Sequence, residues 1–418
     1  MSDLERIDPV ISRLIRAELS RERGVLDMVA SENIAPLAVL EAQGSILSNK
    51  YADGYPGDRL YDGCDVVDEI EMLAINRARD LFGAEHANVQ SYSGANANAA
   101  VLYALVDPGD TILGFDFAHG GHPSQHDAET FAGRFYSSVT YGVRREDGLI
   151  DFDQVERLAK AHRPKVIFAG GSCYPRNIDF AHFRQIADEI GAYLVADLAH
   201  LSGLVAAKIH PDPVPFAHVC TMTLHKTLGG ARGGLILSVS ELADQIDRAV
   251  FPGEQGGPLP HVIAAKAVTL LLAAREDYAE RMRRTVHGAS LIAEMLHQAA
   301  EETHMPVLTG GTDVHLFALD TSPRKVTGQQ ALTWLHNLGI MGNSMTIAYD
   351  PATPPDCSGL RLGTSLLATR GFQEEDFREL GDILVTRLSD LRGPTLLALR
   401  ERAIALGERF PIYPGIDE

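Results

Sequence analysis

Cysteine is scarce in this sequence, and the few cysteines are scattered. Cys64, Cys173, Cys220 and Cys357 form no C-x-x-C pair, and none has a histidine at metal-ligand spacing. Neither a zinc site nor a disulfide framework is therefore expected, and the pattern favours a protein of the reducing cytoplasm.

Basic residues are outnumbered as well. There are 37 Lys and Arg against 56 Asp and Glu, so the formal net charge is −19, and no local basic cluster offsets it. Such a surface repels phosphate backbones and anionic lipid, so we expect no nucleic acid and no membrane among the partners. The N-terminus lacks a basic segment followed by an apolar run, and no stretch approaches the length of a membrane span.

Apolar, β-rich runs alternate with helical stretches through the middle of the chain, which favours an α/β fold with a buried, mostly parallel sheet. The expected strands are 111–115, 134–141, 165–169, 192–196, 219–223 and 234–239, and the expected helices are 66–82, 99–105, 153–161 and 183–190. After residue 276 the pattern changes to a smaller α+β arrangement, with helices at 278–299, 329–338 and 374–391 and strands at 307–309 and 315–319.

These patterns predict an N-terminal arm at 1–34, a large domain at 35–275 and a small C-terminal domain at 276–418. Within the arm, Ile11, Leu14, Ile15 and Leu19 recur at helical spacing and would need a partner surface to cover them.

A lysine at the end of an apolar strand is the most informative single residue. Lys226 follows His225 and precedes the glycine-rich segment 229–234. A lysine in a mostly apolar setting is costly to keep charged, so its amine becomes nucleophilic and suited to a Schiff base. A surface lysine in a turn is the alternative.

Three other features fit a site for pyridoxal phosphate (PLP). Asp197 ends a buried strand at the edge where α/β sheets bind ligands, and a carboxylate there keeps a pyridine nitrogen protonated. Ser93 and Gly94 open an Ala-rich helix whose N–H groups can close around a phosphate. His122 follows a strand and can stack on a flat ring. Each alone has an ordinary structural reading, but together they are the parts of a PLP site.

Further motifs extend this set over nearly the whole chain, and with them the sequence resembles the serine hydroxymethyltransferase family of fold-type I PLP enzymes. The motifs are Ala30-Ser31-Glu32-Asn33, Asn49-Lys50-Tyr51-Ala52-Asp53-Gly54-Tyr55-Pro56-Gly57, His119-Gly120-Gly121-His122, Phe251-Pro252-Gly253-Glu254-Gln255-Gly256-Gly257-Pro258 and Gly310-Gly311-Thr312-Asp313. The resemblance implies an aspartate aminotransferase-like large domain with a mostly parallel seven-stranded sheet and a small α+β C-terminal domain.

The resemblance also implies roles for individual residues. It implies a Schiff base at Lys226 with His225 beside it, a pyridinium partner at Asp197, ring stacking by His122, phosphate contacts from Ser93, Gly94 and Ala95, Ser172 and His200 on the O3′ side of the cofactor, and a substrate carboxylate held by Arg361 and Ser31. Arg361 also suits that role chemically, because a planar guanidinium grips a carboxylate with two parallel hydrogen bonds. The family forms homodimers with shared sites, to which Tyr51, Gly256 and Gly257 would come from the neighbouring subunit.

The sequence departs from the family where folate would bind. Asp53 replaces the family's general acid/base Glu, and Leu60-Tyr61 replaces a Tyr-Tyr pair. Phe117 replaces a Leu that packs on the pterin, and Met345 replaces an Asn that hydrogen-bonds it. These changes make tetrahydrofolate a doubtful substrate, with Leu60, Phe117 and Met345 as a new apolar wall and Tyr61 beside it.

Three hypotheses follow. The first is a folate-independent member that acts on another amino acid or amino-acid conjugate, as in antibiotic biosynthesis, where relatives process S-cysteinyl lincosamide conjugates by β-elimination or decarboxylative oxidative deamination. The second is a genuine serine hydroxymethyltransferase. The third is a non-catalytic binding protein on a PLP scaffold, against which the retention of Lys226, Asp197, His122 and Arg361 argues. The departures favour the first.

Overall fold

The structure, a computed structural model, describes residues 3–350, 352, 356–390 and 396–416, which fall into two compact units. One unit, here called the sheet unit, contains residues 35–283 and 346–350. The other, the terminal unit, contains residues 1–34, 284–345 and 351–418. Each is described by itself.

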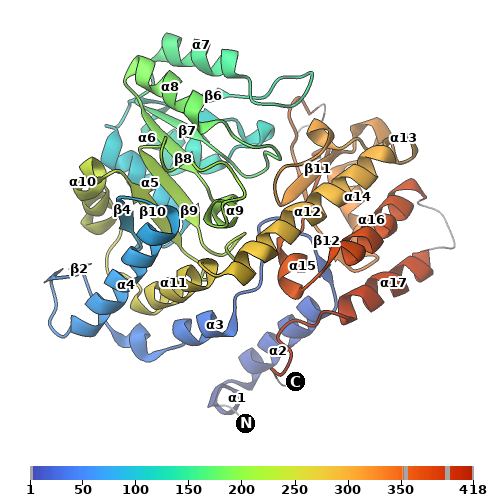
Figure 1. The fold of residues 1–418 in the computed structure, drawn as a ribbon, viewed down its shortest axis with the longest axis horizontal. Coiled ribbons are helices and arrows are strands. Elements are labelled where there is room, and N and C mark those ends of the chain that lie inside the picture. The colour runs from blue at the N-terminus through green and yellow to red at the C-terminus, as the bar shows by residue number, and fades with distance from the viewer. Residues whose placement is uncertain (1–2, 351, 353–355, 391–395, 417–418) are drawn as a thin grey trace. The chain divides into compact units, whose positions relative to one another are not determined.

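A seven-stranded sheet forms the centre of the sheet unit, in the order β4-β10-β9-β8-β7-β5-β6 (Figure 1). Neighbouring strands pair in parallel except around β10, which is antiparallel to both β4 and β9. The strands are β4 (His86–Asn88), β5 (Thr111–Phe115), β6 (Ser137–Tyr141), β7 (Val166–Ala169), β8 (Tyr193–Asp197), β9 (Val219–Thr223) and β10 (Gly234–Ser238). The α/β class and the mostly parallel seven-stranded sheet are confirmed.

The central strands are apolar on both faces because helices cover both. In β7, Val166 and Phe168 join a core cluster with the Ala-rich α5 (Gly94–Leu105), and the alternate Ile167 is equally buried. Helices α7 (Phe152–His162) and α8 (Phe180–Ile190) pack on each other and on the β5–β8 part of the sheet. Parallel strands flanked in this way bring their carboxyl ends to one edge, which positions the site described below.

The other elements of the sheet unit are shorter, apart from two long helices. Helix α11 (Pro260–Ala273) packs on α3 (Leu37–Gln43) and on α4 (Asp65–Phe82), which ends at Gly83 in a left-handed conformation. Shorter α-helices are α6 (Phe131–Phe135), α9 (Ser202–Ala206) and α10 (Ala243–Arg248), and β2 (Gly54–Tyr55) and β3 (Asp58–Arg59) form a hairpin.

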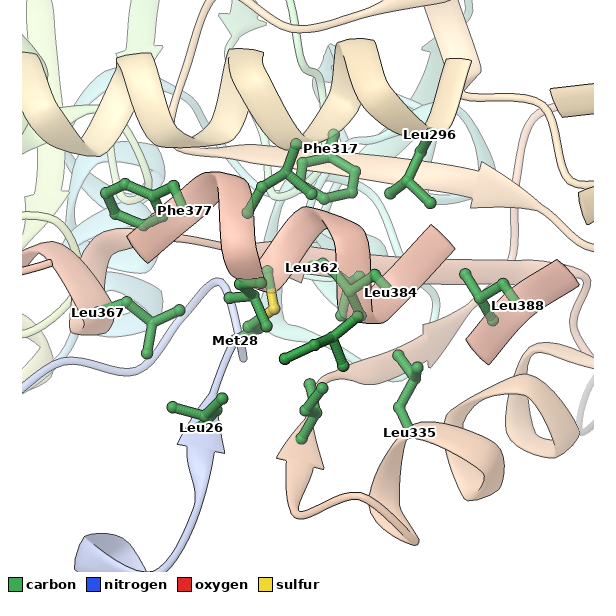
Figure 2. Packing of buried hydrophobic residues seen from close by; sticks show 14 of the residues in the cluster. Leu26, Met28, Leu296, Phe317, Leu335, Leu362, Leu367, Phe377, Leu384 and Leu388 are labelled. Carbon is green, nitrogen blue, oxygen red and sulfur yellow. The ribbon is translucent and has the colours of Figure 1, made fainter. Parts of the chain in front are cut away.

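The terminal unit surrounds a core of its own, shown in Figure 2. Leu26 and Met28 from the N-terminal segment pack there with Phe317, Leu362 and Leu384. Its strands are β1 (Leu26–Asp27) paired with β12 (Ile340–Met341), and a sheet in the order β11 (Leu316–Asp320), β14 (Gly359–Gly363), β13 (Asn343–Met345). Its helices are α13 (Ala300–Thr303), α14 (Gly328–His336), α15 (Ser365–Arg370), α16 (Glu374–Ser389) and α17 (Leu396–Glu408), and α12 (Glu276–Gln298) runs into it from the sheet unit.

The N-terminal segment is helical, as its apolar spacing predicted. It forms α1 (Asp3–Ile7) and α2 (Pro9–Arg23), with the Asp8 side chain capping α2. Arg23 at the end of α2 donates hydrogen bonds to the carbonyls of Ile412 and Tyr413. Within the described residues, no helix is both long enough and apolar enough to cross a membrane.

Some expected elements differ from the structure. The strand predicted at 307–309 is a 3-10 turn in which Thr309 has a positive φ of 59°, and only Val307 forms a β-bridge, with Leu319. The strand predicted from residue 134 begins at Ser137, because residues up to Phe135 form α6. The helix predicted to reach Leu391 ends at Ser389, and Leu391 lies outside the described residues.

Candidate active site

The carboxyl ends of four parallel strands carry most of the predicted cofactor residues. Strands β5, β7, β8 and β9 end at Phe115, Ala169, Asp197 and Thr223. The loops that follow them contain, in the same order, His122, Ser172, His200 and Lys226. The structure therefore places these side chains at one edge of the sheet.

Hydrogen bonds to both of its oxygens hold the Asp197 side chain at this edge. Its Oδ1 accepts a hydrogen bond from the Ala199 N–H at 3.0 Å. Its Oδ2 accepts hydrogen bonds from Asn98 Nδ2 and Gln125 Nε2, both at 3.0 Å. The carboxylate is buried, and three N–H donors from three different segments fix its orientation.

Asn98 also connects Asp197 to His122. Its amide donates to Ser124 Oγ at 2.8 Å, and Ser124 Oγ lies 2.7 Å from His122 Nδ1. The Ser124 N–H also points at Nδ1, at 3.2 Å, so this nitrogen accepts and the ring proton lies on Nε2. On the other side, Asn98 Oδ1 accepts from Thr221 Oγ1 at 2.6 Å.

The sequence motifs did not predict Asn98, Ser124 and Gln125. The available signal was weak: an asparagine among alanines in the helix that Ser93 opens, and a Ser-Gln pair shortly after His122. The bonds from Asn98 to Ser124 and Asp197 span 26 and 99 residues, and the bond from Gln125 to Asp197 spans 72, so spacing along the chain gives no indication of them.

The start of α5 forms a close cradle. Ser93 caps the helix, with its Oγ accepting the Asn96 N–H at 3.1 Å. A Cβ at Gly94 would lie 2.7 Å from Thr223 Cγ2, so the absence of a side chain lets this helix end approach β9. Gly94 and Ala95 thus present first-turn N–H groups with little side-chain bulk.

Lys226 lies on a loop held by hydrogen bonds to the loop after β8. Thr227 Oγ1 donates to the His200 carbonyl at 3.0 Å and accepts the Gly203 N–H at 2.9 Å. Burial, with the nearby charges of Arg232 and Lys226, lowers the pKa of His225 to about 3. His225 is therefore neutral beside the lysine at physiological pH.

The loop with Ser172 packs tightly on its neighbours. The Ser172 N–H donates to the Gly120 carbonyl at 2.8 Å. Gly170 has a φ of +110°, and a Cβ there would lie 2.2 Å from the carbonyl oxygen of Asp197, so only glycine fits. This close approach brings Ser172 and His200 to the same edge as Asp197.

A second group gathers the residues assigned to a neighbouring subunit's site. The rings of Tyr51 and Tyr61 make an edge contact with centroids 5.1 Å apart. A Cβ at Gly257 would lie 3.0 Å from Asp53 Oδ1 and 3.1 Å from the Tyr51 ring. Gly256 adjoins this cluster, and Leu60 nearby in the chain is largely exposed. Asp53 Oδ1 is buried and has no hydrogen-bond partner among the described residues.

The remaining predicted residues are distributed over both units. Phe117 lies partly exposed in the loop after β5, in the sheet unit. Arg361 and Met345 lie on neighbouring strands β14 and β13 of the terminal unit, where Arg361 Nε donates to Asn343 Oδ1 at 2.9 Å. Ser31 follows β1 in the same unit.

The sheet-edge residues fit PLP chemically. The cofactor needs a carboxylate for its pyridinium nitrogen, a flat neighbour for its ring, N–H donors for its phosphate and an amine for its aldehyde. Asp197, His122, the Gly94 end of α5 and Lys226 are of these types. Neighbouring atoms leave no room for a side chain at Gly94 or Gly170, so no side chain from these two positions fills the edge.

Comparison with known proteins decides the family. The sequence matches the protein-family model described as "Serine hydroxymethyltransferase" over residues 4–384. The chain belongs to the serine hydroxymethyltransferase family. It is 53% identical over 417 residues to a serine hydroxymethyltransferase of Clavibacter sepedonicus, covering 99% of this chain and 98% of that protein. It is 52% identical over 416 residues to the one of Nocardia farcinica (99% and 96% covered), and 51% identical over 415 residues to "Serine hydroxymethyltransferase 2" of Mycobacterium tuberculosis (99% and 98% covered).

Membership of the serine hydroxymethyltransferase family makes the protein a PLP-dependent transferase that acts on an amino acid. The prediction of a folate-independent tailoring enzyme is wrong, because full-length relatives at 51–53% identity are named plain serine hydroxymethyltransferases. The comparisons likewise give no support to antibiotic biosynthesis, to a lyase activity or to doubt about tetrahydrofolate.

The departures at Asp53, Leu60, Phe117 and Met345 were given too much weight. With these residues in place, the chain still shares 51–53% identity over its full length with proteins named serine hydroxymethyltransferase. Asp53 keeps the carboxylate of the Glu it replaces. A single sequence does not show how far true family members vary at such positions. A group of changes near the expected folate site was therefore not sufficient to predict a different substrate.

Proposed function

We propose that this protein is a genuine serine hydroxymethyltransferase, which converts serine and tetrahydrofolate to glycine, methylenetetrahydrofolate and water. The observation that carries the proposal is the meeting of Asp197, His122, the Gly94 helix end and the Lys226 loop at one sheet edge, in a family member of this identity.

The cofactor residues have separable tasks in this proposal. PLP, when bound, withdraws electrons from the Cα of the amino acid and so weakens the bonds to it. Lys226 would hold the cofactor aldehyde through its Nζ and release it to the incoming amine. Asp197 would keep the proton on the ring nitrogen, and the Asn98–Ser124 chain would hold His122 flat against the ring.

Ser93, Gly94 and Ala95 would donate to the phosphate, while Ser172, His200 and His225 would surround the O3′ side and the Lys226 loop. Neutral His225, with its pKa lowered to about 3, adds no charge beside the amine.

The substrate would be held by residues of the terminal unit. Arg361 presents a guanidinium that is oriented by the hydrogen bond from its Nε to Asn343 Oδ1, and a planar guanidinium suits a carboxylate. Ser31 would add a hydroxyl. Leu60, Tyr61, Phe117 and Met345 would contact the folate ring system.

Asp53 would move the proton of the serine hydroxyl. Its buried Oδ1 has no hydrogen-bond partner among the described residues, so it can accept one from a substrate. We assign Asp53, Tyr51, Gly256 and Gly257 to the site of a partner subunit in a homodimer with shared sites. The cytoplasmic location suggested by the cysteine pattern stays a prediction.

Turnover with defined substrates tests the proposal. The purified protein is loaded with PLP and given serine and tetrahydrofolate, and glycine and methylenetetrahydrofolate are measured. We expect both products in equal amounts, and micromolar binding of tetrahydrofolate in the presence of glycine by calorimetry. PLP binding without turnover, and without folate binding, would instead favour the non-catalytic scaffold.

Borohydride reduction of the loaded protein followed by peptide mapping tests the cofactor site separately. The label is expected on Lys226, and Lys226→Ala should abolish turnover with the fold intact. Label on another lysine would overturn the site assignment.

A further inference from the structure

The chain between β4 and α5 leaves the sheet just before the proposed phosphate cradle. Residues 89–92 lie outside the strands, and their buried backbone groups need hydrogen-bond partners. Side chains from other segments supply most of them. Gln255 Nε2 donates to the Gln90 carbonyl at 3.0 Å, and Gln255 Oε1 accepts the Tyr92 N–H at 2.9 Å.

Lys266, on α11, donates to two further carbonyls of this segment. Its Nζ donates to the carbonyls of Val89, Ser91 and Gly234 at 2.5, 2.9 and 2.8 Å. An ammonium has three N–H donors, and all three are used. Lys266 is only 1% exposed, which is rare for a lysine, and its whole charge is directed at backbone.

This arrangement is unusual because burying an ammonium is unfavourable. Burial lowers the pKa of Lys266 to about 7, and the nearby Glu71 opposes the shift. Glu71 is itself buried between Arg59 Nη2 at 2.6 Å and Gln90 Nε2 at 2.7 Å. A methionine or leucine would fill the same space without this penalty, so the presence of the amine points to a task.

The three carbonyls lie directly behind the cradle. Ser91 is two residues before the cap residue Ser93, and the Gly234 N–H donates to the Ser91 carbonyl at 2.9 Å. A Cβ at Gly234 would lie 2.4 Å from the Ser93 carbonyl, so Gly234 packs against the cap itself. Lys266 therefore joins the segment that precedes the cradle to strand β10, which packs against it.

We propose that Lys266 is a positioning residue for the cofactor phosphate: by tying Val89, Ser91 and Gly234 together, it sets where Ser93 and Gly94 present their donors. The inference rests on the proposed cofactor site. It predicts that Lys266 matters for the phosphate and little for the pyridine ring, which Asp197 and His122 hold from other strands.

Comparison of PLP with pyridoxal tests this. Pyridoxal has the same ring and aldehyde but a hydroxyl in place of the phosphate. In apo protein titrated with each compound, Lys266→Met should raise the dissociation constant of PLP about tenfold or more and that of pyridoxal less than twofold. Ile186→Ala, which removes a buried side chain from α8, is the control: it should lower the melting temperature and leave the PLP-to-pyridoxal preference unchanged.

Equal weakening of both ligands by Lys266→Met, or no change in their ratio, would show a merely structural lysine and overturn the inference. If the methionine variant does not fold, Lys266→Gln, which keeps donors on a shorter side chain, is titrated in the same way and judged by the same ratio. Borohydride labelling of the wild type distinguishes failure of the cofactor site from failure of the role of Lys266. Label away from Lys226 refutes the cofactor site itself. Label on Lys226, with an unchanged ratio of the PLP and pyridoxal dissociation constants in the variant, refutes only the role of Lys266.

Discussion

Asn98 holds two side chains of the proposed cofactor site at once. It donates to Asp197 and to Ser124, which in turn sets the ring of His122. Asn98→Ala should therefore let both side chains reorient while PLP remains bound. We expect turnover to fall about 10- to 100-fold, as for a small misplacement of reacting groups.

The measurement is kcat and KM for serine together with the absorbance spectrum of the bound cofactor. A shifted spectrum with lower kcat is expected. Unchanged kcat in a protein whose melting temperature has dropped would show that Asn98 supports the fold and not the site.

Arg361 offers a prediction about the substrate alone. Arg361→Ala removes a bidentate, charge-assisted partner from the amino-acid carboxylate, which should weaken glycine binding by about 1.5–3 kcal/mol, or roughly 10- to 100-fold. Calorimetric titration with glycine measures this, and the spectrum of bound PLP should stay as in the wild type. Arg361→Lys, which keeps the charge but loses the fork, should fall between the two. Equal affinity in all three proteins would place the carboxylate elsewhere.

Residues at strand ends could be predicted from the sequence, whereas residues that support them could not. Asp197 and Lys226 each follow an apolar run that marks a buried strand, and their chemical types suggest a task. Gln125 binds Gly170 and Asp197, 45 and 72 residues away, and Lys266 binds backbone 32 to 177 residues away, on elements whose neighbours only the fold reveals. In the sequence Lys266 is simply one lysine in an apolar helix.

Short strands show the same limit at the level of elements. Strand β4 has three residues, His86–Asn88, with no β-branched residue, and it exists because β10 pairs with it. Strand β14, Gly359–Gly363, contains two glycines and an arginine and is held between β11 and β13. The longer apolar strands β5 and β9 were predicted with their observed bounds, because a strand that is buried on both faces appears in the sequence as a largely apolar run.

Strand β1 carries a buried acid with an unusual proton affinity. Burial raises the pKa of Asp27 to about 7; a hydrogen bond with Glu32 adds to the rise, and the Val29 N–H and Arg21 oppose it. Buried Arg370, whose Nη1 binds the Val25 carbonyl, is the other charge that faces it. The folded protein thus keeps a proton that the unfolded chain, in which the pKa of an Asp is about 4, has largely released by about pH 5.

This difference in bound protons makes the folded state less stable as the pH rises. As pH rises from about 4 to 7, the contribution of Asp27 to the free energy of unfolding should fall by about 1.4 kcal/mol per pH unit, and Asp27→Asn should remove this dependence. Urea unfolding at pH 4.5 and pH 7 measures it: relative to wild type, the variant should be more stable at pH 7 than at pH 4.5. A difference between the two proteins that does not change with pH would contradict the raised pKa.

We expect the whole protein to be a homodimer with shared sites. Ile11, Leu14 and Ile15 are exposed along α2, which leaves an apolar stripe for a second copy to cover. Tyr51 and Asp53 would then serve the neighbour's cofactor, while Lys226 serves its own.

Mixed dimers test this directly. Lys226→Ala and Tyr51→Phe should each be nearly inactive alone. When the two are unfolded together and refolded in equal amounts, half the dimers are mixed, and one of the two sites in each is intact, so about a quarter of wild-type activity should return. Mixing without refolding is the control. No recovery, with dimers verified by light scattering, would place Tyr51 and Lys226 in the same subunit's site.

The pairing of β4 with β10 bears on how this molecule comes to fold. The two strands are joined across nearly 150 residues, and every parallel strand between them is added through a crossover connection. Contacts so distant along the chain form slowly, because closing the long loop between them lowers the entropy of the chain before the contacts contribute any stabilising free energy. Because Ser91, Gly234 and Lys266 meet only when that last edge is in place, the ability to capture the phosphate of PLP should arise late in refolding, and the time course of cofactor capture would report completion of the sheet.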